Sequence, residues 1–179
     1  MKALLRTGLL LTALPLFAAA PATADDDHRK PVSPLVQKIR AATAQYKDVE
    51  VAIANGYLPG PCVSGPNQGA MGVHFINGSL LGKEINAETP EALIYEPGHD
   101  GRMRLVGAEY ITFAADWVNE VPVLEGHLLH YAGAPNRYGI PAFYQIHVWA
   151  WRDNPDGTFS DWNRRVSCDA HADMGGHNH

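Results

Sequence analysis

The stretch AFYQIHVWAW, residues 142–151, has the alternating pattern of a β-strand. Side chains on a strand point alternately to two faces, so Ile146 and Val148 share a face that has the composition of an ordinary core. The opposite face carries Phe143, Gln145, His147, Trp149 and Trp151. The pattern therefore predicts a strand that buries one imidazole among large rings, where water is excluded.

The segments around this strand predict a fold that is mainly β. Strand-like patterns cover 71–77, 91–96 and 102–113, and the last two form a predicted hairpin around the turn PGHDG. Short strands separated by Gly/Pro turns are typical of an antiparallel barrel or sandwich.

Residues 34–54 carry apolar side chains at spacings of three and four, which predicts an N-terminal helix packed on the sheet, with a break allowed near 43–47. The glycine- and proline-rich residues 59–72 predict a loop. Residues 116–140 predict a loop with a short helical turn.

The first 24 residues have the features of a secretory signal peptide. Lys2 and Arg6 precede an apolar run from Leu9 to Ala20, and ATA at 22–24 fits a signal-peptidase site. Cleavage after Ala24 would leave 155 of the 179 residues. The sequence thus predicts a periplasmic or secreted bacterial protein with a single exported domain over 25–168, no membrane span and a disordered, His-rich tail over 169–179.

The charge balance argues against two classes of partner. The formal net charge is −5, and removal of Lys2 and Arg6 makes it −7. No basic stripe remains to bind nucleic acid or an anionic membrane surface. A small molecule or a metal ion is the expected partner.

The chain contains two cysteines, Cys62 and Cys168. In an exported protein a pair of cysteines is expected to form a disulfide, whereas two thiolate metal ligands are less common in an oxidising compartment. We therefore predict one bridge between these residues.

Three ionisable residues lie on separate apolar strands: His74, Glu109 and His147. A buried carboxylate is unfavourable by several kcal/mol unless it is paired or binds a cation. Imidazoles with one carboxylate are ligands for a transition metal ion, with copper or zinc favoured here and iron or manganese as alternatives. His127 is the predicted fourth ligand, with His130 as its substitute, because a helical turn would place residues three apart on one side.

Other interpretations remain open at this level. Each histidine can be satisfied by a neighbouring polar group, and Glu109 can pair with a cross-strand arginine, the candidates being Arg102, Arg104 and Arg152. If the metal site is catalytic, Glu109 can serve as a base, with Tyr110 or Tyr144 as proton donor.

Two alternative functions rest on other residues. A metal-free module could bind a glycan or an aromatic ligand through Trp149, Trp151 and Trp162. A periplasmic copper or zinc carrier could instead use the tail, whose candidate ligands are His171, Met174, His177 and His179.

Three stretches together resemble a group of uncharacterised small exported bacterial proteins: GAMGVHFIN, PEALIYEPGHDGRMRLVGAEY and FYQIHVWAWRDNPDGTFSDWNRRVSC. These proteins share the ending HVWxWxxNPxGxFxxWNxxVxC, and the resemblance covers residues 41–168. It implies a single type of exported domain and carries over no functional residue, so the metal hypothesis depends on the residues of this chain.

Overall fold

The computed structural model describes residues 32–82 and 84–174. The predicted signal peptide and two of the tail histidines, His177 and His179, lie outside these ranges. None of the helices in the described ranges has the length and hydrophobicity that crossing a membrane requires.

The chain enters the domain through a helix that is interrupted once. Helix α1 (Pro34–Thr43) begins after Ser33, whose hydroxyl accepts a hydrogen bond from the amide of Val36. A 3₁₀ turn, η1 (Ala44–Lys47), separates it from helix α2 (Val49–Ala54). The helix predicted over 34–54 is therefore confirmed, including the break.

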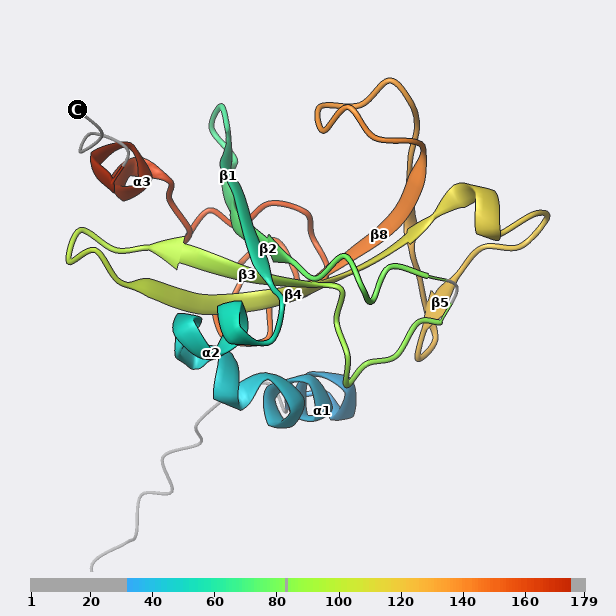
Figure 1. Cartoon of the computed structure of the whole chain (residues 1–179), viewed down its shortest axis with the longest axis horizontal. Coiled ribbons are helices and arrows are strands. Elements are labelled where there is room, and N and C mark those ends of the chain that lie inside the picture. The colour runs from blue at the N-terminus through green and yellow to red at the C-terminus, as the bar shows by residue number, and fades with distance from the viewer. Residues whose placement is uncertain (1–31, 83, 175–179) are drawn as a thin grey trace, which may run out of the picture. The chain divides into compact units, whose positions relative to one another are not determined.

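The main layer is a six-stranded antiparallel sheet with the strand order β1-β2-β3-β4-β8-β7, curled into half a barrel (Figure 1). Its strands are β1 (Leu58–Gly65), β2 (Gly69–Ile76), β3 (Ala92–Pro97), β4 (Met103–Phe113), β7 (His130–Ala132) and β8 (Phe143–Val148). The prediction of a mainly β, antiparallel fold with an N-terminal helix is thus confirmed.

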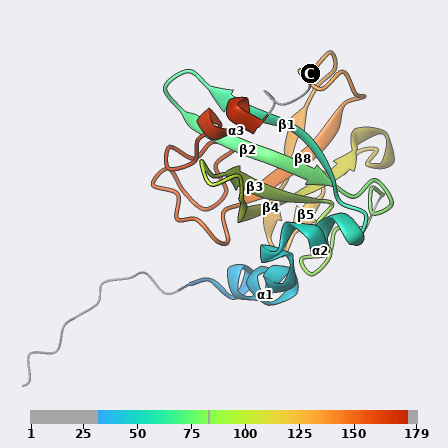
Figure 2. The same ribbon diagram turned by 60° about the vertical axis from the view of Figure 1, so that its left-hand side comes forward.

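The two faces of the sheet have different roles. Helices α1 and α2 lie on the same side of the sheet in Figures 1 and 2. The core on that side includes Leu35 and Ile39 of α1, which are in one cluster with Tyr110, Ile146 and Val148. By strand alternation, Glu109 and His147 point to the opposite face, which no helix of the described N-terminal segment covers.

The prediction of a loop over residues 59–72 is wrong. These residues form β1, a turn and the first part of β2. Pro59 and Pro61 lack amide hydrogens, but β1 is the edge strand and pairs only with β2, so proline is tolerated there. The register shifts between Pro59 and Cys62 absorb the irregularity.

The segment predicted as a loop with a helical turn is also more regular than expected. The 3₁₀ turn η2 (Ala114–Asp116) ends at its first residue, and the segment itself contains a two-stranded hairpin of β5 (Val123–Leu124) and β6 (His127–Leu128), and strand β7. The tail, predicted to be disordered from residue 169, begins with the short helix α3 (Asp169–Met174).

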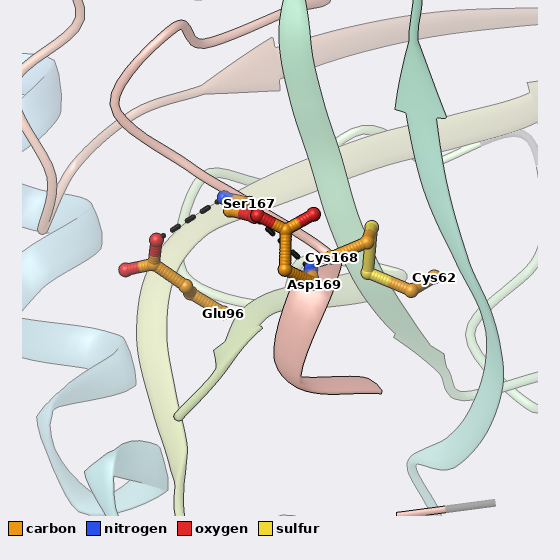
Figure 3. Close-up of a disulfide and its surroundings, with 5 residues drawn as sticks. All are labelled: Cys62, Glu96, Ser167, Cys168 and Asp169. Carbon is orange, nitrogen blue, oxygen red and sulfur yellow. Dashed lines mark hydrogen bonds between the residues drawn. A yellow bond between two sulfur atoms is a disulfide. The ribbon is translucent and has the colours of Figure 1, made fainter. Parts of the chain in front are cut away.

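Residues 149–168 fold back across the sheet without forming a further named strand. Ala70 and Asn163 exchange two backbone hydrogen bonds of 3.1 and 3.2 Å. The predicted Cys62–Cys168 disulfide is present and fastens the end of this segment to β1 (Figure 3). The amide of Ser167, next to the bridge, donates to the carboxylate of Glu96 in β3.

Candidate metal centre

Three strands bring His74, Glu109 and His147 together on the face away from the helices. Glu109 in β4 lies directly opposite His147 in β8. His74 is in β2, separated from Glu109 by β3. In β3, Ala92 pairs with Glu109 and Ile94 pairs with His74, so the two residues reach each other diagonally across this strand.

The ligand-type atoms of these residues converge on one point. Nε2 of His74 lies 3.1 Å from Nε2 of His147 and 3.3 Å from Oε2 of Glu109. Nε2 of His147 lies 3.8 Å from Oε1 of Glu109. All three residues offer an atom within 4.8 Å of the others, and all three are buried. This group, which we call the triad, is compatible with metal binding.

Burial and neighbouring charges together shift the pKa values of the triad. Burial, together with the nearby charge of His147, lowers the pKa of His74 to about 3, so this imidazole is neutral at physiological pH. Burial also raises the pKa of Glu109. For His147 burial acts to lower the pKa, but the carboxylates of Glu109 and Asp161 outweigh it and leave the pKa raised.

A second carboxylate, that of Asp161, lies next to Nδ1 of His147, the ring nitrogen that faces away from the triad. Oδ1 of Asp161 lies 3.4 Å from Nδ1 of His147, at ion-pair distance rather than in a closed hydrogen bond. His147 and then His130 lower the pKa of Asp161, so its carboxylate is ionised. Nδ1 of His74, in contrast, is buried without a hydrogen-bond partner among the described residues. Sequence reasoning missed Asp161, which follows β8 in an irregular segment.

The two loop histidines lie outside the triad. His127 is in β6, where its ring packs on Phe159 with 4.1 Å between ring centroids. His130 is exposed in β7, and its Nδ1 lies 3.7 Å from Asp161. The helical turn predicted to orient both residues is therefore wrong, because each belongs to a strand.

The sequence left open that Glu109 pairs with a cross-strand arginine. Within residues 84–174, two of the candidate arginines make other contacts. Arg104 pairs there with Asp100, and Arg152 pairs with Glu96 at 4.0 Å and donates to a backbone carbonyl. The ion-pair contacts of Glu109 are to the two imidazoles.

The aromatic residues considered for function lie elsewhere. Tyr110 and Tyr144 point to the helix side, where the hydroxyl of Tyr110 donates to the carbonyl of Ala87. Trp149 stacks beside His147 and is buried in the core. Strand β8 ends at Val148, so Trp151 does not continue the His147 face and instead donates to Thr43 of α1. The ring of Trp162 lies under Arg137.

A cavity of about 230 Å³ lies against the triad. It is lined by His74 and Glu109 and by residues of β1, β4, β8 and the loop that precedes β8. Sequence reasoning did not assign Gln145 or Tyr138 to this site, although Gln145 lies on the predicted face of β8. His171 of α3 lines a different depression, together with residues of η1, α2 and β4.

No family model matches the chain, and comparison with curated proteins and with solved structures found no match. The chemistry of the site must therefore be argued from its own geometry.

Proposed function

We propose that this chain is an exported protein that binds one transition metal ion through Nε2 of His74, Nε2 of His147 and the carboxylate of Glu109. The donor atoms come from three different strands and converge in a buried place. Bringing a carboxylate out of water is unfavourable unless a positive charge accompanies it, and a bound metal ion would supply that charge to Glu109.

The arrangement of protons carries the proposal. The ionised carboxylate of Asp161 favours a proton on Nδ1 of His147, so Nε2 is the nitrogen of that ring that a metal ion would bind, displacing any proton it carries. Nε2 of His147 lies 3.1 Å from Nε2 of His74 and 3.8 Å from Oε1 of Glu109. A metal ion among these atoms would be held by three coordinate bonds and would take the place of the protons that now link the rings and the carboxylate.

Asp161 also supports the proposal as a neighbour of the ligands. Histidines that bind metals commonly donate their second ring N–H to a carboxylate, which fixes the tautomer and makes the ligand more basic. Asp161 is in this position relative to His147.

The donor set narrows the choice of metal. Two imidazoles and a carboxylate suit copper, zinc, iron or manganese, and copper and zinc bind such sites most tightly among these metals. Three protein ligands leave a coordination position open, as in catalytic zinc sites. A Cys62–Cys168 disulfide fits an oxidising compartment, which agrees with the export predicted from residues 1–24.

The test is the metal content of the untagged protein, exported to the periplasm of a bacterial host and measured by mass spectrometry. We expect one metal ion per chain, its loss in His147→Ala and in His74→Ala, and its retention in His127→Ala, the matched control. Deletion of residues 169–179 should leave the stoichiometry unchanged. A wild-type protein without bound metal, before and after dialysis against zinc or copper, would overturn the proposal. Loss of metal on deletion of the tail alone would favour the carrier hypothesis.

A further inference from the structure

The triad is nearly closed off from solvent, although a cavity reaches it. Glu109 is 3% exposed, His74 6% and His147 0%. A metal ion in solution carries a shell of water molecules, so its passage requires a wider opening than these exposures provide. A buried metal site therefore needs an entry path, and part of the wall around the triad has to move to create it.

Three parts of this wall are held by backbone pairing or by a covalent bond. The sheet itself carries the triad. Strand β1 is paired with β2 and is bridged to the returning segment, residues 149–168, by the disulfide between Cys62 and Cys168. The returning segment is also fastened to β2 by the two backbone hydrogen bonds between Ala70 and Asn163. None of these parts can swing aside while its pairing is intact.

The fourth part of the wall is the loop at 133–141, which joins β7 to β8 and projects beyond the sheet in Figure 1. From this loop Tyr138 and Ile140, both 38% exposed, line the cavity. Every residue of the loop except Asn136 is exposed. Among the described residues, no backbone hydrogen bond joins the loop to another segment. It is therefore the part of the wall that is free to move.

The loop is organised by its own hydrogen bonds. The side chain of Asn136 accepts from the amides of Tyr138 and Ile140 and donates to the carbonyls of Gly133 and Ile140. Such a loop can move as one body on its two paired ends, where Ala132 lies opposite Phe143. Segments with few buried contacts open at a lower free energy than the core of the same protein.

The contacts that tie this loop to the rest of the domain come from side chains. The guanidinium of Arg137 lies over the ring of Trp162, 5.3 Å from its centroid. The hydroxyl of Tyr138 donates to Sδ of Met71 at 3.7 Å, and the ring of Tyr138 packs edge-on against Phe143. An exposed cation–π contact and a thioether acceptor are both weak interactions, so these ties hold the loop closed without locking it.

We infer that the loop at 133–141 is a lid over the triad, and that its opening is the step that admits and releases the metal ion. The inference rests on the proposed function in one respect, the metal ion as the species that passes. No residue of the lid belongs to the triad. Opening of the lid therefore sets the rate of metal exchange, whereas the equilibrium affinity is set by the triad.

Arg137→Ala is the decisive variant, because Arg137 ties the lid without lining the cavity. In the metal-free protein, the rate at which diethyl pyrocarbonate modifies His74, followed by peptide mass spectrometry, measures how often the lid is open. In the wild type His74 should react at least about tenfold more slowly than the exposed His130. In Arg137→Ala it should react about two- to fivefold faster than in the wild type, the factor that one exposed cation–π contact provides. Arg102→Ala, in the turn between β3 and β4, is the matched control and should leave the rate unchanged.

The zinc-loaded protein gives a second measurement, the rate at which an excess of chelator removes the metal. Arg137→Ala should release zinc faster by the same factor and bind it with unchanged affinity. Tyr138→Ala removes both contacts of Tyr138 and widens the entrance, so it should raise both rates at least about tenfold. Its matched control is Tyr131→Ala, which removes an exposed ring that packs on Tyr144 and should exchange zinc as the wild type does.

The outcomes separate the lid from the metal site. The inference is overturned if His74 of the wild type reacts as fast as His130, or if Arg137→Ala reacts as the wild type does. It is also overturned if zinc affinity falls by the same factor as release accelerates, because the variant would then act on the bound state and not on access. If His74 responds as expected in a protein that holds no metal, the lid stands and the metal proposal fails. If zinc binds at the triad and every variant exchanges it at the wild-type rate, the reverse holds.

Discussion

Asp161 lies 3.4 Å from Nδ1 of His147, while Nε2 of the same ring faces His74 and Glu109. The imidazole of His147 thus lies between the partly exposed carboxylate of Asp161 and the other two residues of the triad. Its orientation depends on a residue fourteen positions further along the chain, in the irregular segment that the Ala70–Asn163 bridge fastens to β2.

Removing the charge of Asp161 should weaken the metal site without removing a ligand. In Asp161→Asn we expect a 10- to 100-fold loss of zinc affinity, roughly the effect of losing the outer partner of a histidine ligand, measured by competition with a chromophoric chelator. Asp156→Asn removes a carboxylate from the same segment that pairs instead with Arg164, and should bind zinc as the wild type does. Equal affinities in all three proteins would show that Asp161 has no influence on the centre.

Zinc should stabilise the folded protein through Glu109. At 100 times its dissociation constant, zinc raises the free energy of unfolding by about 2.7 kcal/mol. In a domain of this size that corresponds to an increase in Tm of roughly 5–10 °C, measured by thermal unfolding with zinc and with a chelator. Glu109→Gln should lose this increase because the amide is a poor ligand.

The control for that experiment is Glu91→Gln. Glu91 is also a buried carboxylate, but it accepts a hydrogen bond from the amide of Ile111 and is not part of the triad. This variant should keep the full effect of zinc on Tm. An undiminished zinc effect in Glu109→Gln would remove Glu109 from the ligand set.

The triad could be anticipated because strand alternation is local. In 142–151 a period of two assigns His147 to a face, and an acidic residue within the apolar stretch around Glu109 is conspicuous in the sequence alone. The strand at 59–65 was not predicted because Pro59 and Pro61 disfavour a central strand, and only the sheet order reveals an edge. Local pattern says nothing of which strand lies outermost.

The remaining parts of the site depend on contacts between distant residues. Asp161 reaches His147 because its segment is held by the predicted disulfide at Cys168 and by the Ala70–Asn163 bridge, and the bridge has no signature in the sequence. The spacing of His127 and His130 suggested a helical turn, but pairing of β5 with β6 and of β7 with β8 overrides it. The cavity is likewise formed by segments that approach only in the folded chain.

Gly69 is required where that returning segment meets β2. Its φ is +77°, and a Cβ added there would lie 2.2 Å from the carbonyl oxygen of Asn163 and 2.6 Å from Cα of Arg164. Both contacts are with backbone, which cannot move aside cheaply, so Gly69→Ala should lower the free energy of unfolding by about 3 kcal/mol in urea denaturation. Gly78→Ala has open space around the new methyl group and should change the free energy of unfolding by about 0.5 kcal/mol at most. Similar losses in both variants would refute the steric argument.

Because of Glu91, the free energy of unfolding should decline as the pH rises. Burial raises the pKa of Glu91 from 4.5 to about 7, against the opposing effect of its hydrogen bond with Ile111. Below pH 4.5 the carboxyl is protonated in both states. Between pH 4.5 and 7 the folded state keeps a proton that the unfolded chain releases, so the free energy of unfolding falls by about 3 kcal/mol in total.

Glu91→Gln should abolish this decline, because an amide does not titrate and still accepts from the amide of Ile111. The quantity to measure is the difference in unfolding free energy between variant and wild type from pH 4 to 8, in the presence of a chelator. Taking the difference cancels the contribution of Glu109, whose pKa is raised as well. As the pH rises, the free energy of unfolding of the variant should increase relative to that of the wild type, with most of the change between pH 5 and 7. A difference that is constant over this range would mean that Glu91 titrates in the folded protein as it does in the unfolded chain.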